Sequence, residues 1–108
     1  MTVELPKSLA DYFAAANTDD ADRIAACFAE EAVVRDEGRD IRGRGAVRAW
    51  AAEARRKYRF RAEVITVDET ADRTIVTARV TGDFPGSPVD LHYRFKLAGQ
   101  AIIALEIG

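Results

Sequence analysis

In the first half of the chain, hydrophobic side chains recur every three or four residues, which is the spacing of one face of an α-helix. Three segments show this pattern, with polar or glycine-containing breaks between them. The first stripe is Leu5, Leu9, Tyr12, Phe13 and Ala16, the second is Ala21, Ile24, Ala25 and Phe28, and the third is Val47, Trp50, Ala51 and Ala54. The pattern therefore predicts three helices, each with one buried face.

The remaining segments alternate hydrophobic and polar residues, which is the period of a strand with one buried face. Two short strands are expected at 32–37 and around 40–42, and a last strand at 101–107. Between them, three strands carry inward side chains at Tyr58, Phe60, Ala62 and Val64, at Val76, Ala78, Val80, Gly82 and Phe84, and at Val89, Leu91, Tyr93, Phe95 and Leu97. Helices followed by a meander of strands predict an α+β domain with the helices on one face of an antiparallel sheet.

Composition narrows the class of protein. The 108 residues suit a single domain, 1–108, and 48% hydrophobic with 31% charged residues is typical of a globular protein. A net charge of −2 gives no general attraction to nucleic acid or to anionic membranes. No apolar run approaches the ~20 residues of a membrane span, and residues 1–6 lack the regions of a signal peptide. We therefore expect a cytoplasmic protein without nucleic-acid or membrane partners.

Side chains that bind metals or act as nucleophiles are scarce. Cys27 is the one cysteine and His92 the one histidine, which excludes an intrachain disulfide and argues against a zinc site. Cys27 lies on the second helical stripe, as a buried thiol would, and strand alternation places His92 on the outer face of the sheet. Asp36, Glu37 and Asp40 could be considered for a divalent cation, but alternation sends the first two to opposite faces. We expect no metal and no cofactor.

Asp36 is the most distinctive candidate for chemistry. It ends an apolar strand, and alternation puts it on the same face as Val34. Desolvation among apolar side chains raises the pKa of a carboxyl group, which suits it to exchange protons. The alternative interpretation is a strand-end residue that makes an Asx turn before Gly38. Tyr12 is either a polar group of the same site or a core tyrosine whose hydroxyl is satisfied locally.

The apolar inward faces predict a pocket. A curved sheet covered by helices along one side leaves a cavity at its open end, and an apolar cavity with few polar groups is the usual form of a small-molecule site. The expected lining residues are Phe28, Val34, Trp50, Tyr58, Phe60, Val80, Leu91 and Tyr93. The cations of the segment 55–61 alternate with inward aromatics, so they form a solvated face rather than a platform for nucleic-acid bases.

The order of elements resembles the nuclear transport factor two-like superfamily, in particular its SnoaL-like polyketide cyclase and ketosteroid isomerase-like branch. The resemblance covers essentially the whole chain and depends most on segments 21–36 and 41–50. It implies a cone-shaped α+β roll, in which a strongly curved antiparallel sheet wraps around three helices and a pocket. It also implies a homodimer across the outer face of the sheet, where the sequence offers Ile65, Val67, Ile75 and Ile102.

The same resemblance implies roles for individual residues. Asp36 matches the general base of the family, and Tyr12 matches the tyrosine that donates to the substrate oxyanion. The isomerase's second donor, a protonated aspartate, falls on Leu91, and a supporting tyrosine falls on Ala51. Losing one of two donors would remove about 3 kcal/mol of transition-state stabilisation, so efficient steroid isomerisation is not expected.

Three functions stay open at this point. The first is a metal-free enzyme of isomerase or cyclase type, in which Asp36 takes a proton from carbon next to a carbonyl in a small hydrophobic substrate. The second is a module that binds a small hydrophobic ligand without chemistry. The third is a dimerisation domain with a filled core. One fold can carry all three, so the residues of the site must decide.

Overall fold

The computed structural model describes residues 5–108, so most of segment 1–6, which lacks the features of a signal peptide, lies outside the described residues. Within this range the chain forms three helices and six strands. The helices are α1 (Lys7–Ala16), α2 (Ala21–Ala25) and α3 (Arg44–Tyr58). The strands are β1 (Phe28–Asp36), β2 (Arg39–Arg42), β3 (Arg61–Glu69), β4 (Thr74–Thr81), β5 (Val89–Ala98) and β6 (Ala101–Ile107).

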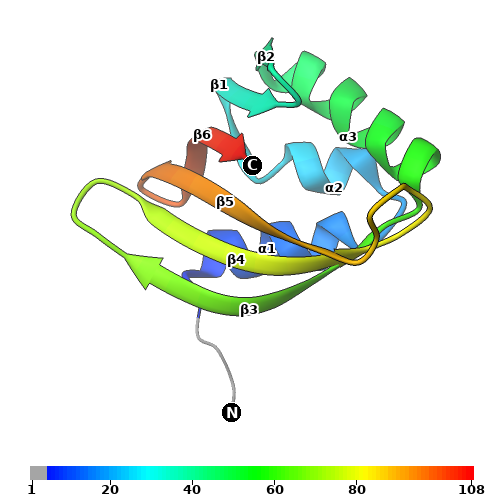
Figure 1. Cartoon of the computed structure of the whole chain (residues 1–108). Coiled ribbons are helices and arrows are strands. Elements are labelled where there is room, and N and C mark those ends of the chain that lie inside the picture. Colours follow the sequence, from blue (N-terminus) through cyan, green and yellow to red (C-terminus); the bar gives the residue numbers. More distant parts are fainter. Residues whose placement is uncertain (1–4) are drawn as a thin grey trace.

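The strands form one curved, unclosed sheet whose concave side faces the helices (Figure 1). Its order is β2-β1-β6-β5-β4-β3. Four neighbouring pairs are antiparallel, whereas β1 and β6 run parallel. The predicted α+β roll is confirmed, but the sheet is mixed, because the last strand inserts between β1 and β5. No helix within residues 5–108 is long and apolar enough to cross a membrane.

The second helix is shorter than the sequence pattern predicted. It begins after Asp20, whose side chain accepts a hydrogen bond from the Arg23 backbone N–H, and it ends at Ala25. Phe28 belongs instead to β1, which starts four residues earlier than expected. Because Phe28 stands four residues after Ile24, helical spacing could not separate it from the helix. Cys27 consequently lies in the connection, half-buried, and not on a helical face.

The chain leaves α3 through a tight turn that sequence alternation did not reveal. Tyr58 is the last residue of α3 rather than a strand residue, and Arg59 has a left-handed backbone conformation with φ of 45°. Gly82 passes close by, and a Cβ atom there would lie 2.6 Å from the Tyr58 carbonyl oxygen. The turn still leaves Tyr58 and Phe60 on the concave side, as expected.

The outer face of the sheet differs from its predicted composition. A bulge in β3 between Val64 and Thr66 shifts the alternation, so that Val67 packs against the core. Ile102 was expected outside but is fully buried, and its neighbour Ile103 is exposed instead. Of the four predicted outer residues, Ile65 is exposed.

Aromatic side chains fill the concave side beneath α1. Tyr12 and Phe13 of α1 meet Tyr93 and Phe95 of β5 edge to face, with ring centroids 5.4 Å apart for Tyr12 and Phe95 and 5.2 Å apart for Phe13 and Tyr93. Such contacts add to the stabilisation from burying the rings. This packing fixes α1 against the sheet.

We expect Phe95→Ala to lower the free energy of unfolding by about 3–5 kcal/mol, because it removes a fully buried ring and leaves a void. The matched control is Phe84→Ala, whose ring is half-buried and already borders open space. Urea unfolding of both variants measures the difference. Equal losses would contradict the view that the aromatic packing under α1, rather than the wall of the cavity, holds the fold together.

Candidate functional site

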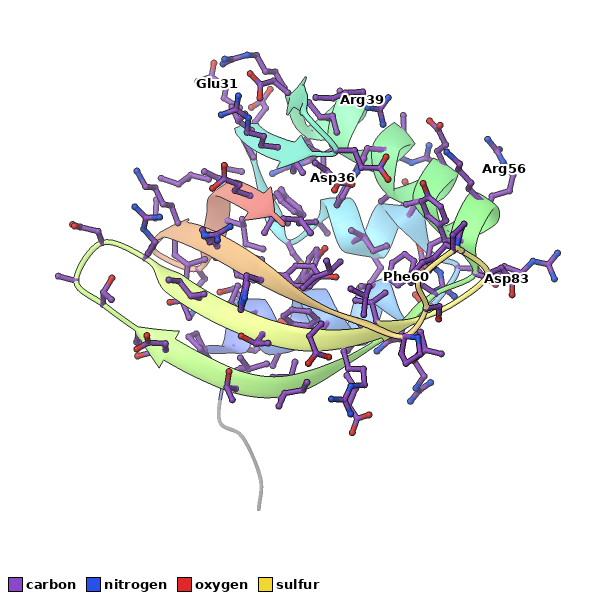
Figure 2. The ribbon with its side chains drawn as sticks, viewed as in Figure 1. Glu31, Asp36, Arg39, Arg56, Phe60 and Asp83 are labelled. Carbon is purple, nitrogen blue, oxygen red and sulfur yellow. The ribbon has the colours of Figure 1, made fainter. Side chains whose placement is uncertain are left out.

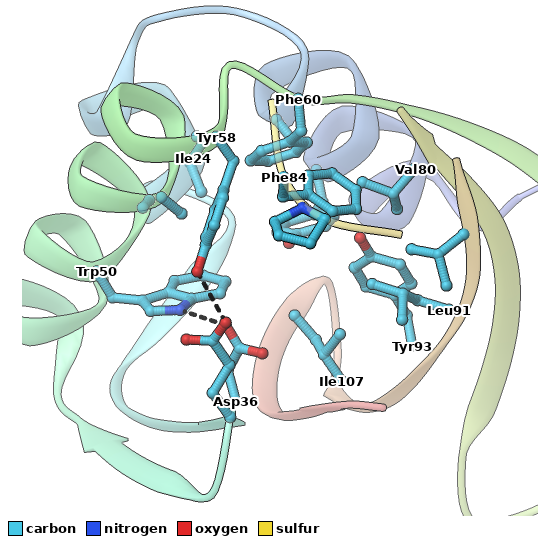
Figure 3. Close-up of a pocket in the computed structure, with 17 residues that line it drawn as sticks. Ile24, Asp36, Trp50, Tyr58, Phe60, Val80, Phe84, Leu91, Tyr93 and Ile107 are labelled. Carbon is cyan, nitrogen blue, oxygen red and sulfur yellow. Dashed lines mark hydrogen bonds between the residues drawn. The ribbon is translucent and has the colours of Figure 1, made fainter. Parts of the chain in front are cut away.

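A cavity of about 420 Å³ lies between the sheet and the helices, beyond the aromatic packing under α1 (Figure 3). Its wall is mainly apolar and aromatic. The lining residues are Tyr12, Ala16, Ile24, Asp36, Glu37, Trp50, Ala51, Ala54, Tyr58, Phe60, Val80, Phe84, Pro85, Val89, Leu91, Tyr93 and Ile107. This volume and character are typical of sites for small organic molecules.

Most of the expected wall residues do meet around this cavity. Trp50, Tyr58, Phe60, Val80, Leu91 and Tyr93 line it together with Asp36 and Tyr12. Phe28 and Val34 do not line it and belong instead to the packed core, with exposures of 1% and 0%. Strand alternation identifies the buried face correctly. It cannot tell which residues of that face are packed in the core and which border the cavity.

Small side chains on α3 are part of the reason that the cavity exists. Ala51 and Ala54 line it next to Trp50, although only Trp50 had been expected there. Ala51 is also the position where the family resemblance implies a tyrosine. An alanine fills less space than an aromatic ring, so this face of α3 leaves room beside the sheet. The helical stripe of the sequence already contained this signal.

Asp36 is the last residue of β1 and points into the cavity (Figure 3). The indole N–H of Trp50 donates a hydrogen bond to Asp36 Oδ2 over 3.0 Å. Burial raises the pKa of Asp36 above its ordinary value, and the neighbouring Glu37 charge raises it further. The Trp50 hydrogen bond and the cationic Arg39 oppose this rise by favouring the carboxylate. The sequence had not paired Trp50 with Asp36.

Glu37 also lines the cavity, which corrects the expectation that it faces away from Asp36. It forms, with Gly38, the two-residue turn between β1 and β2, with φ of 53° and 75° respectively. Positive φ at both positions is the geometry that suits a tight hairpin, and it redirects the Glu37 side chain. The Tyr58 hydroxyl donates to Glu37 Oε1 over 3.0 Å.

The charged side chains on the cavity wall are both acidic, Asp36 and Glu37. Figure 2 shows Arg39 and Arg56 on the outside of the molecule, whereas Asp36 and Phe60 lie between the sheet and the helices. Within residues 5–108, no three histidine, cysteine or acidic side chains come together in a way that could hold a metal ion. Because the charged side chains on the wall are both acidic, the cavity disfavours an anionic ligand.

Two tyrosine hydroxyls on the wall have no hydrogen-bond partner within residues 5–108. Tyr12 and Tyr93 are almost fully buried as residues and line the cavity. Arg55 Nε is the one buried side-chain polar atom left unpaired in the described chain, so both hydroxyls must border open space. Burial is the main cause that raises the pKa of each tyrosine, and the Asp36 charge raises it further. Both hydroxyls therefore stay protonated and able to donate.

Arg55 is an exception to the solvated face predicted for residues 55–61. Its side chain is only 15% exposed. The guanidinium donates to the Phe60 carbonyl oxygen, lies 5.0 Å from the centre of the Phe60 ring, and forms an ion pair with Asp19. These contacts fix the segment that carries Phe60 into the cavity wall.

Comparison with known proteins is consistent across sequence and structure. The family model of the SnoaL-like domain matches residues 9–104. A candidate polyketide cyclase of Sinorhizobium meliloti is 38% identical in sequence, with 96% of this chain and 95% of that chain covered and a TM-score of 0.92. No curated protein matches the chain in sequence.

More distant solved structures share the fold. One is a Catenulispora acidiphila protein with a ketosteroid isomerase-like fold, solved with trimethylamine, at 16% identity and a TM-score of 0.86, covering 97% of this chain and 86% of that chain. Another is an NTF2-like protein of unknown function from Cytophaga hutchinsonii, at 11% identity and a TM-score of 0.80, covering 100% of this chain and 91% of that chain. At these identities the likeness concerns the fold alone.

The single tryptophan makes Asp36 directly observable. We expect the Trp50 indole N–H resonance to titrate with a midpoint above the ~3.9 of an ordinary aspartate, because burial raises the pKa of Asp36. On acidification, protonation of Asp36 should weaken the hydrogen bond and shift this resonance. Two-dimensional NMR across the acidic range measures it, and Asp36→Asn should abolish the titration. A midpoint at or below ~3.9 would exclude a raised pKa.

Proposed function

The chain belongs to the SnoaL-like domain family, and from this premise we propose that its cavity binds a small hydrophobic molecule on which Asp36 acts as a general base. One observation carries the proposal: a half-buried carboxylate stands on the wall of an apolar cavity that Tyr12 also lines, and the Tyr12 hydroxyl has no partner within residues 5–108. A base and a hydrogen-bond donor in one cavity are the minimum for moving a proton next to a carbonyl group.

In this proposal the two oxygens of Asp36 have different tasks. The hydrogen bond from Trp50 holds Oδ2, so Oδ1 is the oxygen that accepts the proton from carbon. The pKa of Asp36, raised by burial, brings the carboxylate closer to the basicity that this transfer needs. As the proton leaves, negative charge develops on the carbonyl oxygen, and the Tyr12 hydroxyl donates to it. In a substrate with a neighbouring C=C bond, Asp36 then returns the proton to the far carbon of the dienolate and the double bond moves, which gives isomerisation. In a substrate with a second carbonyl group, the enolate carbon attacks that carbonyl carbon, the C=O π electrons move to its oxygen, and this oxygen takes the proton from Asp36, which gives cyclisation.

The character of the wall supports a neutral substrate. Asp36 and Glu37 would repel an anion entering the cavity, and among residues 5–108 no basic side chain lines it to compensate. Aromatic and aliphatic groups from α3, β4 and β5 supply the apolar contacts. A small, uncharged molecule that carries a carbonyl group meets each of these conditions.

We expect Asp36→Asn to slow proton exchange at carbon by at least about 100-fold, because it removes the base while keeping the shape of the side chain. The probe is β-tetralone in deuterated water, with deuterium incorporation followed by NMR. The matched control is Asp40→Asn, since Asp40 is an exposed carboxyl group on β2 that pairs with Arg35 and does not line the cavity.

The same measurements separate the base role from a binding role. If the unaltered chain binds β-tetralone and catalyses no exchange above the Asp36→Asn level, the binding module is the correct function and the base role is wrong. If neither β-tetralone nor its hydrocarbon analogue tetralin binds, the proposal of a hydrophobic-ligand site is wrong as well. Titration calorimetry provides the binding measurement in both cases.

We also propose a homodimer formed through the outer face of the sheet. Ile65 and Ile103 are large hydrophobic residues with exposures of 37% and 39% on the strands β3 and β6. Burying such side chains between two copies would remove apolar surface from water. Sedimentation velocity at micromolar concentration should show a dimer, and Ile103→Glu should shift it toward monomer. A monomer of the unaltered chain at that concentration would contradict the proposal.

A further inference from the structure

The hydroxyls of Tyr12 and Tyr93 belong to two residues that line the cavity. A tyrosine hydroxyl inside a protein usually has a hydrogen-bond partner, either in the chain or in a molecule that reaches it. The third tyrosine of the chain, Tyr58, follows this rule, since its hydroxyl donates to Glu37. Tyr12 and Tyr93 have no such partner within residues 5–108, and both border the cavity. Because these hydroxyls are accessible and their residues line the cavity, each can donate to a molecule bound there.

The two hydroxyls belong to side chains that are neighbours. The rings of Tyr12 on α1 and Tyr93 on β5 are 6.4 Å apart between centroids and meet at 60°. Phe13 and Phe95 pack against both rings, so neither is free to turn away from the cavity. Figure 3 shows the Tyr93 hydroxyl directed into the cavity and Asp36 on the opposite part of its wall.

The chemistry of the pair is that of two neutral donors. Burial holds both phenols in their protonated form, and the Asp36 charge acts in the same direction. A phenol donates one hydrogen bond, and a carbonyl oxygen accepts two through its lone pairs. An alkene, an aromatic hydrocarbon or an ammonium group has no acceptor oxygen to offer. The pair therefore fits a carbonyl group.

We infer that Tyr93 acts together with Tyr12 as a second hydrogen-bond donor to the carbonyl oxygen of the ligand, which makes ketones the class of molecule that the cavity recognises. This inference rests on the proposed function, because it assigns the same cavity. Tyr93 stands two residues after Leu91 on the same face of β5, next to the position that lacks a donor when the family resemblance is followed residue by residue. The missing donor is thus replaced from the neighbouring position of the strand.

The test compares a ketone with its hydrocarbon analogue. We expect the unaltered chain to bind β-tetralone at least about tenfold more tightly than tetralin, because two hydrogen bonds of ordinary strength distinguish them. Tyr93→Phe and Tyr12→Phe should each lower the affinity for β-tetralone about 3–10-fold and leave the affinity for tetralin unchanged. Thr77→Val is the control and should leave the ketone preference intact, since it removes a hydroxyl that lies 3.1 Å from His92 Nδ1 and does not line the cavity.

An infrared measurement gives a readout that a purely structural role would not change. The carbonyl stretch of bound β-tetralone should shift to lower frequency in the unaltered chain, and part of the shift should disappear in Tyr93→Phe but not in Thr77→Val. An unshifted stretch, or an equal affinity for ketone and hydrocarbon in the unaltered chain, would overturn the inference. Either result leaves the hydrophobic-ligand site standing, whereas failure of both compounds to bind would reject the site itself.

Discussion

The structure depends on how the concave side of a strongly curved sheet is filled. At the end covered by α1, Tyr12 and Phe13 pack edge to face on Tyr93 and Phe95, and almost no space remains. At the end covered by α3, the helix presents Ala51 and Ala54 beside Trp50, and the sheet is not filled. The same curvature that brings α1 into contact therefore leaves about 420 Å³ under α3. The curvature of the sheet therefore accounts both for the contact with α1 and for the cavity. Tyr12 and Tyr93 take part in the aromatic packing and also line the cavity.

The polar groups of the cavity lie in two places. Tyr12 and Tyr93 stand between the aromatic packing under α1 and the cavity, and Asp36 stands at the end of β1. Asp36 can remain half-buried because its neighbours have opposing effects on its pKa. Burial and Glu37 raise its pKa, while the Trp50 hydrogen bond and Arg39 favour its charged form. A carboxylate with no partner would be too costly in this setting, and one with several strong partners would be too weak a base. The neutral N–H donors of the Trp50 indole and the Glu37 backbone, with the nearby Arg39 charge, give a balance between the two.

The sequence predicted the larger features because each of them has a period. Helical spacing identified α1 and α3, and alternation identified the inward residues of β4 and β5, together with the shared face of Val34 and Asp36. The errors occur where a local feature breaks a period: the bulge after Val64, which turns Val67 inward, and the left-handed conformation of Glu37, which brings a second carboxylate to the cavity.

Other features of the site have no periodic signal at all. The pairing of Trp50 with Asp36, and the separation of Phe28 and Val34 from the cavity wall, depend on how α3 lies across the sheet. A likeness in fold does not supply them either, since a protein only 16% identical superposes with a TM-score of 0.86. The backbone tolerates almost complete replacement of its side chains, so chemistry must be argued from the few polar groups that reach the cavity. In this chain those groups are Asp36 with the Trp50 indole, Glu37 with the Tyr58 hydroxyl, and the phenols of Tyr12 and Tyr93, whose hydroxyls have no partner within residues 5–108. A carbonyl compound is the ligand that we propose for this arrangement.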